Sequence, residues 1–136
     1  MKIYFAGSIS GGRDDKELYF KIIQLLKDYG EVLTEHIGNQ ALSQIGEDGA
    51  NEYIYKRDIK WLKESDLVVA EVTTPSLGVG FEVSKAVEWK KNILCIYRKI
   101  EGKRLSAMIA GCPKIKVFEY KTISNLKTIF DLDLKL

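Results

Sequence analysis

Apolar residues along this chain follow two patterns, short continuous runs and stretches with helical spacing. A continuous run is typical of a strand buried on both faces, whereas apolar residues at every third or fourth position are typical of a helix that packs on one side. The continuous runs predict strands at residues 2–6, 31–36, 66–72, 92–97 and 114–120. The helical spacing predicts helices between residue 15 and Gly30, at 51–65, from about 77 to 88, at 105–111 and at 123–134.

Strands and helices alternate along the whole chain, with short connections between most of them. Such alternation favours right-handed crossovers, which place helices on both faces of a parallel sheet. We therefore predict an α/β fold: a doubly wound, flavodoxin- or Rossmann-like, five-stranded parallel sheet with strand order 2-1-3-4-5. The 136 residues suffice for one hydrophobic core but not for two, so we expect one domain over residues 1–136.

Composition excludes several classes of function. Lys and Arg number 21 against 19 Asp and Glu, a net charge of +2, so no strong field would attract nucleic acid or an acidic membrane. Cys95 and Cys112 have neither metal-ligand spacing nor the pattern of a disulfide framework, which fits a reducing compartment. No apolar run approaches the roughly 20 residues of a membrane span, and the first residues lack the apolar core of a signal peptide. We expect a soluble, unprocessed cytoplasmic protein.

The loop after the first predicted strand is rich in glycine and serine. It reads Gly7-Ser8-Ile9-Ser10-Gly11-Gly12-Arg13-Asp14-Asp15 and runs into a helix. Backbone N–H groups and the helix dipole at such a junction favour anions. The loop follows neither the Walker A pattern nor the dinucleotide-binding spacing. Two interpretations stay open from the residues alone, a phosphate or sugar site and a plain connection between strand and helix.

Two carboxylates lie on predicted helix faces that are otherwise apolar. Asp58 is in line with Ile54 and Trp61, and Glu82 is in line with Val79. A carboxylate that faces a core is costly unless it is hydrogen-bonded or has a chemical role. Asp58 could instead cap a neighbouring loop, and Glu82 could pair with the dipole of its own helix.

These carboxylates suggest a reaction class. Two carboxylates in a partly desolvated cleft suit glycosyl chemistry, in which one attacks or stabilises an oxocarbenium-like carbon and the other handles a proton. Tyr4, at the neighbouring first strand, could orient one of them through its hydroxyl. His36, the lone histidine, could contact a ligand or be structural. The sequence shows no metal-binding constellation. The residues favour an enzyme that acts on a sugar phosphate or a nucleotide.

Several runs of this sequence are characteristic of one family: residues 3–9, 33–36, 58–62, 68–82 and 105–109. Together they resemble the 2'-deoxynucleoside 5'-monophosphate N-hydrolases of the nucleoside 2-deoxyribosyltransferase superfamily. The resemblance covers the chain to about Gly111 and is most specific at residues 68–82. It implies hydrolysis of a deoxynucleoside monophosphate to free base and 2-deoxyribose 5-phosphate, with no cofactor and no metal.

The resemblance also implies roles for individual residues. Glu82 would attack the sugar C1' and form a covalent glycosyl-enzyme, Asp58 would handle a proton, and Tyr4 would orient Glu82. The substrate contacts that we expect lie at Gly7, Ser8, Ile9, Ser10, His36, Ser76, Gly78 and Gly80, with Ser8 and Ser76 at the phosphate. The resemblance further implies a homodimer in which Ser106 and Met108 reach the adjacent subunit's site.

Two positions bear on alternative functions. The transferase branch of the superfamily brings an asparagine from the neighbouring subunit, whereas this chain has Ser106 in a Leu-Ser-Ala-Met-Ile context, which favours the hydrolase. Ser10 stands where related hydrolases often carry an arginine, so phosphate affinity or base preference could differ, and Arg13 or Arg104 could compensate. The alternatives are base exchange between nucleosides, hydrolysis of ribonucleotides, and nucleotide binding without catalysis.

Overall fold

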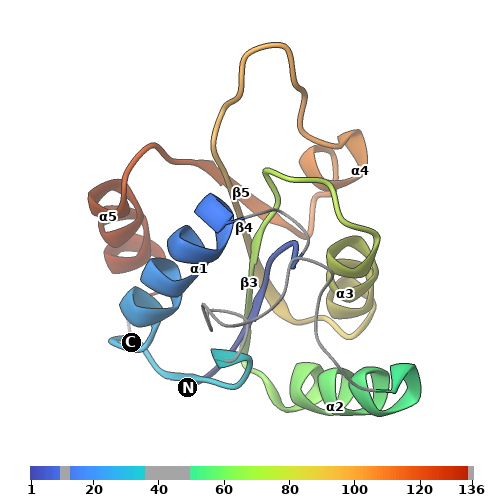
Figure 1. The fold of residues 1–136 in the computed structure, drawn as a ribbon. Helices are drawn as coiled ribbons and strands as arrows, with labels where there is room; N and C mark the ends of the chain where they lie inside the picture. The colour runs from blue at the N-terminus through green and yellow to red at the C-terminus, as the bar shows by residue number, and fades with distance from the viewer. Residues whose placement is uncertain (10–12, 36–49, 135–136) are drawn as a thin grey trace.

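The computed structural model describes residues 1–9, 13–35 and 50–134 (Figure 1). Its strands form one parallel sheet in the order β2-β1-β3-β4-β5. The strands are β1 (Lys2–Ala6), β2 (Glu31–Val32), β3 (Leu67–Glu71), β4 (Asn92–Tyr97) and β5 (Lys116–Glu119). The helices are α1 (Arg13–Leu26), α2 (Asn51–Glu64), α3 (Leu77–Glu88), α4 (Ala107–Ala110) and α5 (Ile123–Asp133). The predicted doubly wound fold and its strand order are confirmed.

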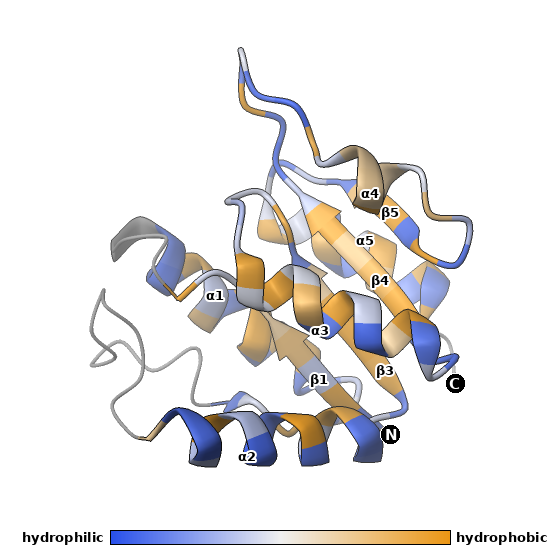
Figure 2. Ribbon diagram, turned by 90° about the vertical axis from the view of Figure 1, so that its right-hand side faces the viewer, coloured by the Kyte–Doolittle hydropathy of each residue, from blue (hydrophilic) through white to orange (hydrophobic). Residues whose placement is uncertain are grey.

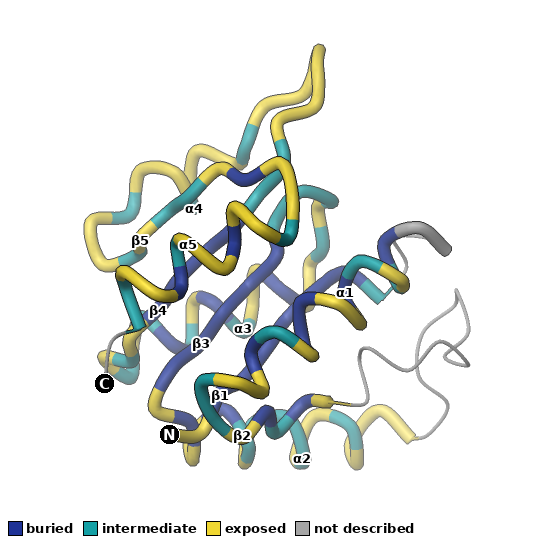
Figure 3. The backbone as a smooth tube through the Cα atoms, turned by 90° about the vertical axis from the view of Figure 1, so that its left-hand side faces the viewer, coloured by how far each residue is buried: buried dark blue, intermediate teal, exposed yellow. Residues whose placement is uncertain are grey.

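The helices form two layers, with α1 and α5 on one face of the sheet and α2, α3 and α4 on the other (Figures 1 and 2). The central strands are apolar and buried between these layers (Figures 2 and 3). Neighbouring positions of a strand point to opposite faces, so Phe5 packs toward α1 while Tyr4 packs toward α2 and α3. No helix in the described ranges is long and apolar enough to cross a lipid bilayer.

The largest error of the sequence prediction concerns the second strand. We predicted residues 31–36, but β2 ends at Val32. Beyond it, Thr34 Oγ1 accepts a hydrogen bond from the Phe5 N–H at 2.8 Å and donates one to the Phe5 carbonyl at 2.7 Å. Because this hydroxyl satisfies the edge of β1, the backbone can leave the sheet early. His36, which we placed at the strand end, lies outside the described residues.

Apart from α1, which ends at Leu26 and not directly before Gly30, the other boundaries agree with the prediction to within about two residues. Strands β1 and β4 have the predicted bounds, and β3 and β5 are shorter than predicted by one or two residues at each end. Helix α1 begins at Arg13, inside the segment predicted as loop. The loops after β1 and β3 lead to helices on opposite faces, so the crevice between these two strands is the point where open α/β sheets bind ligands.

Candidate active site

Tyr4, Asp58 and Glu82 come from three separate elements and meet on the same face of the sheet. Tyr4 is fully buried on β1, Asp58 lies in the middle of α2, and Glu82 lies in the second turn of α3. Burial raises the pKa of the Tyr4 hydroxyl, and the negative charges of Glu82 and Asp58 raise it further. The structure therefore brings the three predicted catalytic residues together.

Glu82 titrates near neutrality. Burial raises its pKa from 4.5 to about 7 by disfavouring the charged form. The interaction with the Tyr4 hydroxyl partly opposes this rise, and the negative charge of Asp58 adds to it. A carboxylate with this pKa is ionised in a large fraction of molecules at neutral pH, yet little free energy is needed to neutralise it. Both properties suit a nucleophile that gives up its charge when it forms a bond.

The Tyr4 hydroxyl is the one buried side-chain polar atom of the described chain that lacks a hydrogen bond of normal geometry. It is nevertheless near enough to Glu82 to lower the pKa of that carboxyl. Leaving a buried hydroxyl unpaired costs about 1–3 kcal/mol, and structural tyrosines are usually paired. The hydroxyl is therefore available to hold Glu82 when the carboxylate or a ligand shifts slightly.

Asp58 is held in place by its neighbour Arg57. Nε and Nη2 of Arg57 each lie 3.0 Å from Asp58 Oδ1. The guanidinium is stacked on Trp61, 4.9 Å from the ring centroid, and lies 5.6 Å from the Tyr53 ring centroid. Our sequence analysis missed Arg57, although a cation next to an inward-facing acid on a helix is a signal that could have identified it.

Ser76 directly precedes α3 as its N-cap, at the same end of the helix as Glu82. Its Oγ accepts a hydrogen bond from the Val79 N–H at 3.2 Å and so caps the helix. A Cβ added at Gly78 would lie 3.8 Å from Ser76 Oγ and 3.9 Å from Glu82 Oε1, so both oxygens lie close to Gly78. The site therefore includes the first turn of α3, whose unpaired amides favour an anion.

Gly7 and Ser8 turn tightly around Tyr19 of α1. The Ser8 N–H donates to Tyr19 Oη at 3.1 Å. A Cβ at Gly7 would lie 2.9 Å from the Tyr19 ring, so only glycine fits there. The Ser8 amide is thus already engaged, and the side chain is what Ser8 can offer to a ligand. Ile9 is partly buried, whereas Ser10 lies outside the described residues.

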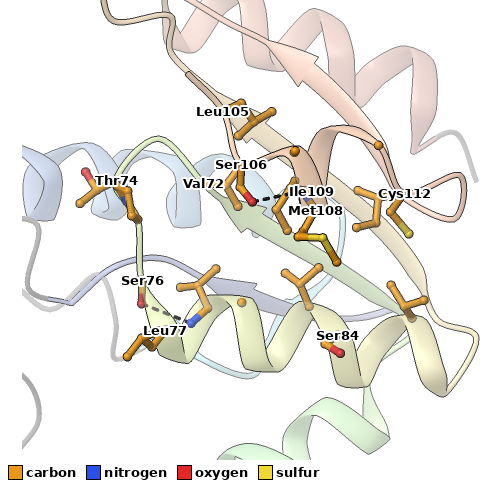
Figure 4. Close-up of a pocket in the computed structure, with 18 residues that line it drawn as sticks. Val72, Thr74, Ser76, Leu77, Ser84, Leu105, Ser106, Met108, Ile109 and Cys112 are labelled. Carbon is orange, nitrogen blue, oxygen red and sulfur yellow. Dashed lines mark hydrogen bonds between the residues drawn. The ribbon is translucent and has the colours of Figure 1, made fainter. Parts of the chain in front are cut away.

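An apolar groove of about 780 Å³ runs between α3 and α4 (Figure 4). Gly80 and Val83 line one wall, and Ser106 and Met108 line the other. No atom fills the space in front of Gly80 within 4 Å, and Met108 is 82% exposed. Tyr4, Asp58 and Glu82 do not line this groove. Ser106 and Met108 therefore share this groove with Ser76, while the three candidate catalytic side chains lie outside its lining.

A second polar cluster lies on the opposite face of the sheet, and our sequence analysis missed it. Glu71, the last residue of β3, is completely buried. Arg98 Nε lies 3.4 Å from Glu71 Oε2, and Arg98 Nη2 lies 3.0 Å from Asp15 Oδ1. The signal was present: Glu71 shares its strand face with Leu67 and Val69, so alternation assigns it to the core.

The side chains of Tyr4, Asp58 and Glu82 suit one kind of chemistry. A carboxylate with a near-neutral pKa, a second carboxylate and a phenol can together attack an electrophilic carbon and transfer a proton to or from the leaving group. The adjoining turn of α3 can bind an anionic part of the same ligand. In the part of the chain that the structure describes, no three His, Cys, Asp or Glu side chains gather so as to hold a metal ion.

Glutamine in place of Glu82 is expected to stabilise the fold at alkaline pH. The pKa of Glu82 is about 7 in the folded protein against 4.5 ordinarily, so between these pH values the folded state binds more protons than the unfolded state. The stability of the wild type relative to an uncharged variant therefore falls as pH rises through this window. We expect Glu82→Gln to gain roughly 1–3 kcal/mol in the free energy of unfolding at pH 8 and nothing at pH 4.

Urea denaturation at the two pH values measures this difference. Glu88→Gln is the matched control, because Glu88 ends the same helix with its side chain 67% exposed. The control should show no gain in the free energy of unfolding between pH 4 and pH 8 relative to the wild type. Equal stability of Glu82→Gln and the wild type at pH 8 would contradict the burial of a charged Glu82.

Known proteins share much of the sequence of this chain. A family model described as nucleoside 2-deoxyribosyltransferase matches residues 3–113. A Nematostella vectensis protein, provisionally named 2'-deoxynucleoside 5'-phosphate N-hydrolase 1, is 58% identical over 125 residues, which cover 88% of this chain and 85% of the relative. The 5-hydroxymethyl-dUMP N-hydrolase of Tetraodon nigroviridis is 53% identical over 113 residues, covering 82% and 80% of the two chains.

A solved structure has the same fold at much lower sequence identity. The 2-deoxyribosyltransferase of Bacillus psychrosaccharolyticus aligns with a TM-score of 0.70 and 19% identity. The alignment covers 100% of this chain and 97% of that one. The order and layering of the elements are therefore shared.

Proposed function

The chain belongs to the nucleoside 2-deoxyribosyltransferase family, and we propose that it is an enzyme that hydrolyses the N-glycosidic bond of 2'-deoxynucleoside 5'-monophosphates. The products are the free base and 2-deoxyribose 5-phosphate. The names of relatives that are 53% and 58% identical support this substrate class. The structural observation that carries the proposal is the convergence of Tyr4, Asp58 and Glu82, with the pKa of Glu82 near 7.

The reaction proceeds in two displacements at C1' of the sugar. The Glu82 carboxylate attacks C1', the C1'–N bond breaks, and its electron pair leaves with the base, which takes up a proton. Water then attacks C1', the bond to Glu82 breaks, and the carboxylate is regenerated. Asp58 handles the proton on the departing base or the incoming water. The Tyr4 hydroxyl holds the Glu82 oxygen that does not attack.

The phosphate end of the substrate lies at the first turn of α3 and the loop after β1. Ser76 keeps its hydroxyl proton while its oxygen caps α3, so it can donate to a phosphate oxygen. The amides around Gly78 and the side chain of Ser8 complete this end. A phosphate held by two or three charge-assisted hydrogen bonds gains on the order of 100-fold in affinity.

A homodimer completes the site. Within one chain, Ser106 and Met108 line the groove beside α3, and Glu82 does not. The groove is apolar, and Leu77 and Met108 at its walls are 97% and 82% exposed, as expected of a surface that another subunit covers. In the dimer, Ser106 of each subunit contacts the phosphate bound by the other. A cytoplasmic location stays a prediction.

A panel of substrates tests the proposed function. It contains deoxy- and ribonucleoside monophosphates, 5-hydroxymethyl-dUMP and the corresponding nucleosides, with base release followed by chromatography. We expect release from deoxynucleoside monophosphates, with kcat/KM at least about 100-fold above that of the unphosphorylated nucleosides. Adding a second free base to each reaction is the control for base exchange, and the hydrolase should form little of the exchanged nucleotide.

Other outcomes identify the alternatives. Release from ribonucleotides at a similar rate would indicate a ribonucleotide N-hydrolase. An exchanged product in quantity would indicate a transferase. Thermal stabilisation by nucleotides without any turnover would indicate a binding protein and would contradict the proposal.

A further inference from the structure

A buried group of charges at the carboxyl edge of the sheet has no part in the chemistry above. It consists of Asp15, Glu71 and Arg98, the Asp15–Glu71–Arg98 cluster. Arg98 donates from Nε to Glu71 at 3.4 Å and from Nη2 to Asp15 at 3.0 Å. Glu71 also accepts a hydrogen bond from the Tyr120 hydroxyl. The exposed fractions of the side chains are 11% for Asp15, 0% for Glu71 and 31% for Arg98.

The cluster fastens the start of the loop between β3 and α3. Glu71 Oε1 accepts from the Thr73 N–H at 2.7 Å, and Thr73 Oγ1 accepts from the Arg98 N–H at 2.9 Å. Thr74 Oγ1 donates to Asp15 Oδ2 at 3.0 Å. Both threonines are thus bonded to the cluster or its backbone. Ser76 follows Thr74 after a proline, which restricts the connecting backbone.

The cluster also reaches the loop between β1 and α1. Asp15 lies in the first turn of α1, and Tyr19, one turn later, accepts the hydrogen bond from the Ser8 N–H. The charges of Glu71 and Asp15 both act on the Tyr19 hydroxyl, so Tyr19 lies near the cluster. One helix therefore carries both the contact to Thr74 and the contact to Ser8.

Stability alone does not account for such an arrangement. Two carboxylates and one guanidinium are costly to desolvate, and apolar side chains of similar volume are often at least as stable in such a place. What ion pairs and hydrogen bonds add is a defined direction for each partner. Here the partners are the two loops whose serines form the phosphate end of the proposed site.

We propose that the Asp15–Glu71–Arg98 cluster is a positioning device that holds the Ser8 loop and the Ser76 loop in register and thereby sets the preference for phosphorylated over unphosphorylated substrates. This inference rests on the proposed function. The cluster touches no reacting atom. Its effect passes through Thr74 to Ser76 and through Tyr19 to Ser8, so its loss weakens binding of the phosphate more than the chemical step at C1'.

Three variants test the link between Asp15 and Thr74. Asp15→Asn keeps the shape but can keep only one of the two accepted hydrogen bonds, because an amide has a single acceptor oxygen. Thr74→Val removes only the donor. We expect each variant to lower the ratio of kcat/KM for a deoxynucleoside monophosphate to kcat/KM for its nucleoside by about 10-fold, mainly through KM. The double variant should lose little more than either single variant, because both break the same link.

Leu126→Ala is the matched control for loss of stability. Leu126 is fully buried on α5, in the core that faces away from Tyr4, Asp58 and Glu82. It should lower Tm without changing the ratio. An unchanged ratio in Asp15→Asn and Thr74→Val would overturn the inference, even if kcat/KM fell equally for the monophosphate and the nucleoside. Absence of turnover in the wild type would instead overturn the proposed function, so the two failures are distinguishable.

Discussion

Glutamine in place of Glu82 will lower base release from a deoxynucleoside monophosphate by about 10⁴-fold or more, because an amide cannot form the bond to C1'. The substitution preserves the volume of the side chain and removes its partly buried charge. The fold should therefore survive and even gain stability at alkaline pH. Single-turnover measurement of free base by chromatography gives the size of the loss.

The pH dependence of the same reaction provides a second readout. Glu82 attacks only when it is ionised. The kcat/KM of the wild type should therefore rise with pH through about 7, the pKa of Glu82 in the enzyme without substrate. Tyr4→Phe should move this limb to higher pH, because the Tyr4 hydroxyl lowers the pKa of Glu82. Glu88→Gln on the same helix should leave both rate and pH profile unchanged. Base release by Glu82→Gln within 10-fold of the wild type would exclude Glu82 as the nucleophile.

An aspartate at position 106 will abolish activity on monophosphates while leaving the chain folded. Ser106 caps α4 by accepting the Met108 N–H at 3.3 Å, and aspartate caps a helix equally well. The new carboxylate would face the phosphate bound by the other subunit, and such a juxtaposition of like charges costs several kcal/mol. We expect kcat/KM to fall about 100-fold or more for the monophosphate and much less for the nucleoside.

Mixed dimers test whether the site is shared. Glu82→Gln and Ser106→Asp subunits, each inactive alone, should regain activity when they are mixed and allowed to exchange. Each heterodimer contains one site with both native residues, so about a quarter of the wild-type activity should return if mixing is random.

Ser124→Asp is the matched control for the added charge, because Ser124 is exposed on α5 at the opposite face of the sheet. It should be fully active. A protein that is monomeric by light scattering, or a mixture that stays inactive after exchange, would contradict the shared site.

The local patterns of the chain were sufficient for most of the fold. Continuous apolar runs and helical spacing depend on neighbours a few residues apart, so β1 and β4 have the predicted bounds. The prediction of where the second strand ends was wrong, because that end does not depend on near neighbours. It depends on a hydroxyl of Thr34 that bonds to Phe5 across the sheet, at a separation of 29 residues. No periodicity within the strand contains that information.

Some residues of the site could likewise be predicted from the sequence, and others could not. An acid among apolar residues was a local signal that singled out Asp58 and Glu82, and the motifs around them indicated the family. The ion pairs of Arg98 with Glu71 and Asp15 were missed, because Glu71 and Asp15 precede Arg98 in the sequence by 27 and 83 residues. Arg57 was missed although its contacts are local, with Asp58 beside it and Trp61 one turn further along α2.

The sequence by itself determined the layered α/β fold, the family and the identity of the candidate nucleophile, because each depends on short stretches of chain. Only the tertiary structure decided that the pKa of Glu82 lies near 7, that Ser106 lines a groove to which Glu82 does not contribute, and that buried charges connect the loops of Ser8 and Ser76. Desolvation and charge pairing depend on distances through space, and these exist only once the strands and helices have packed.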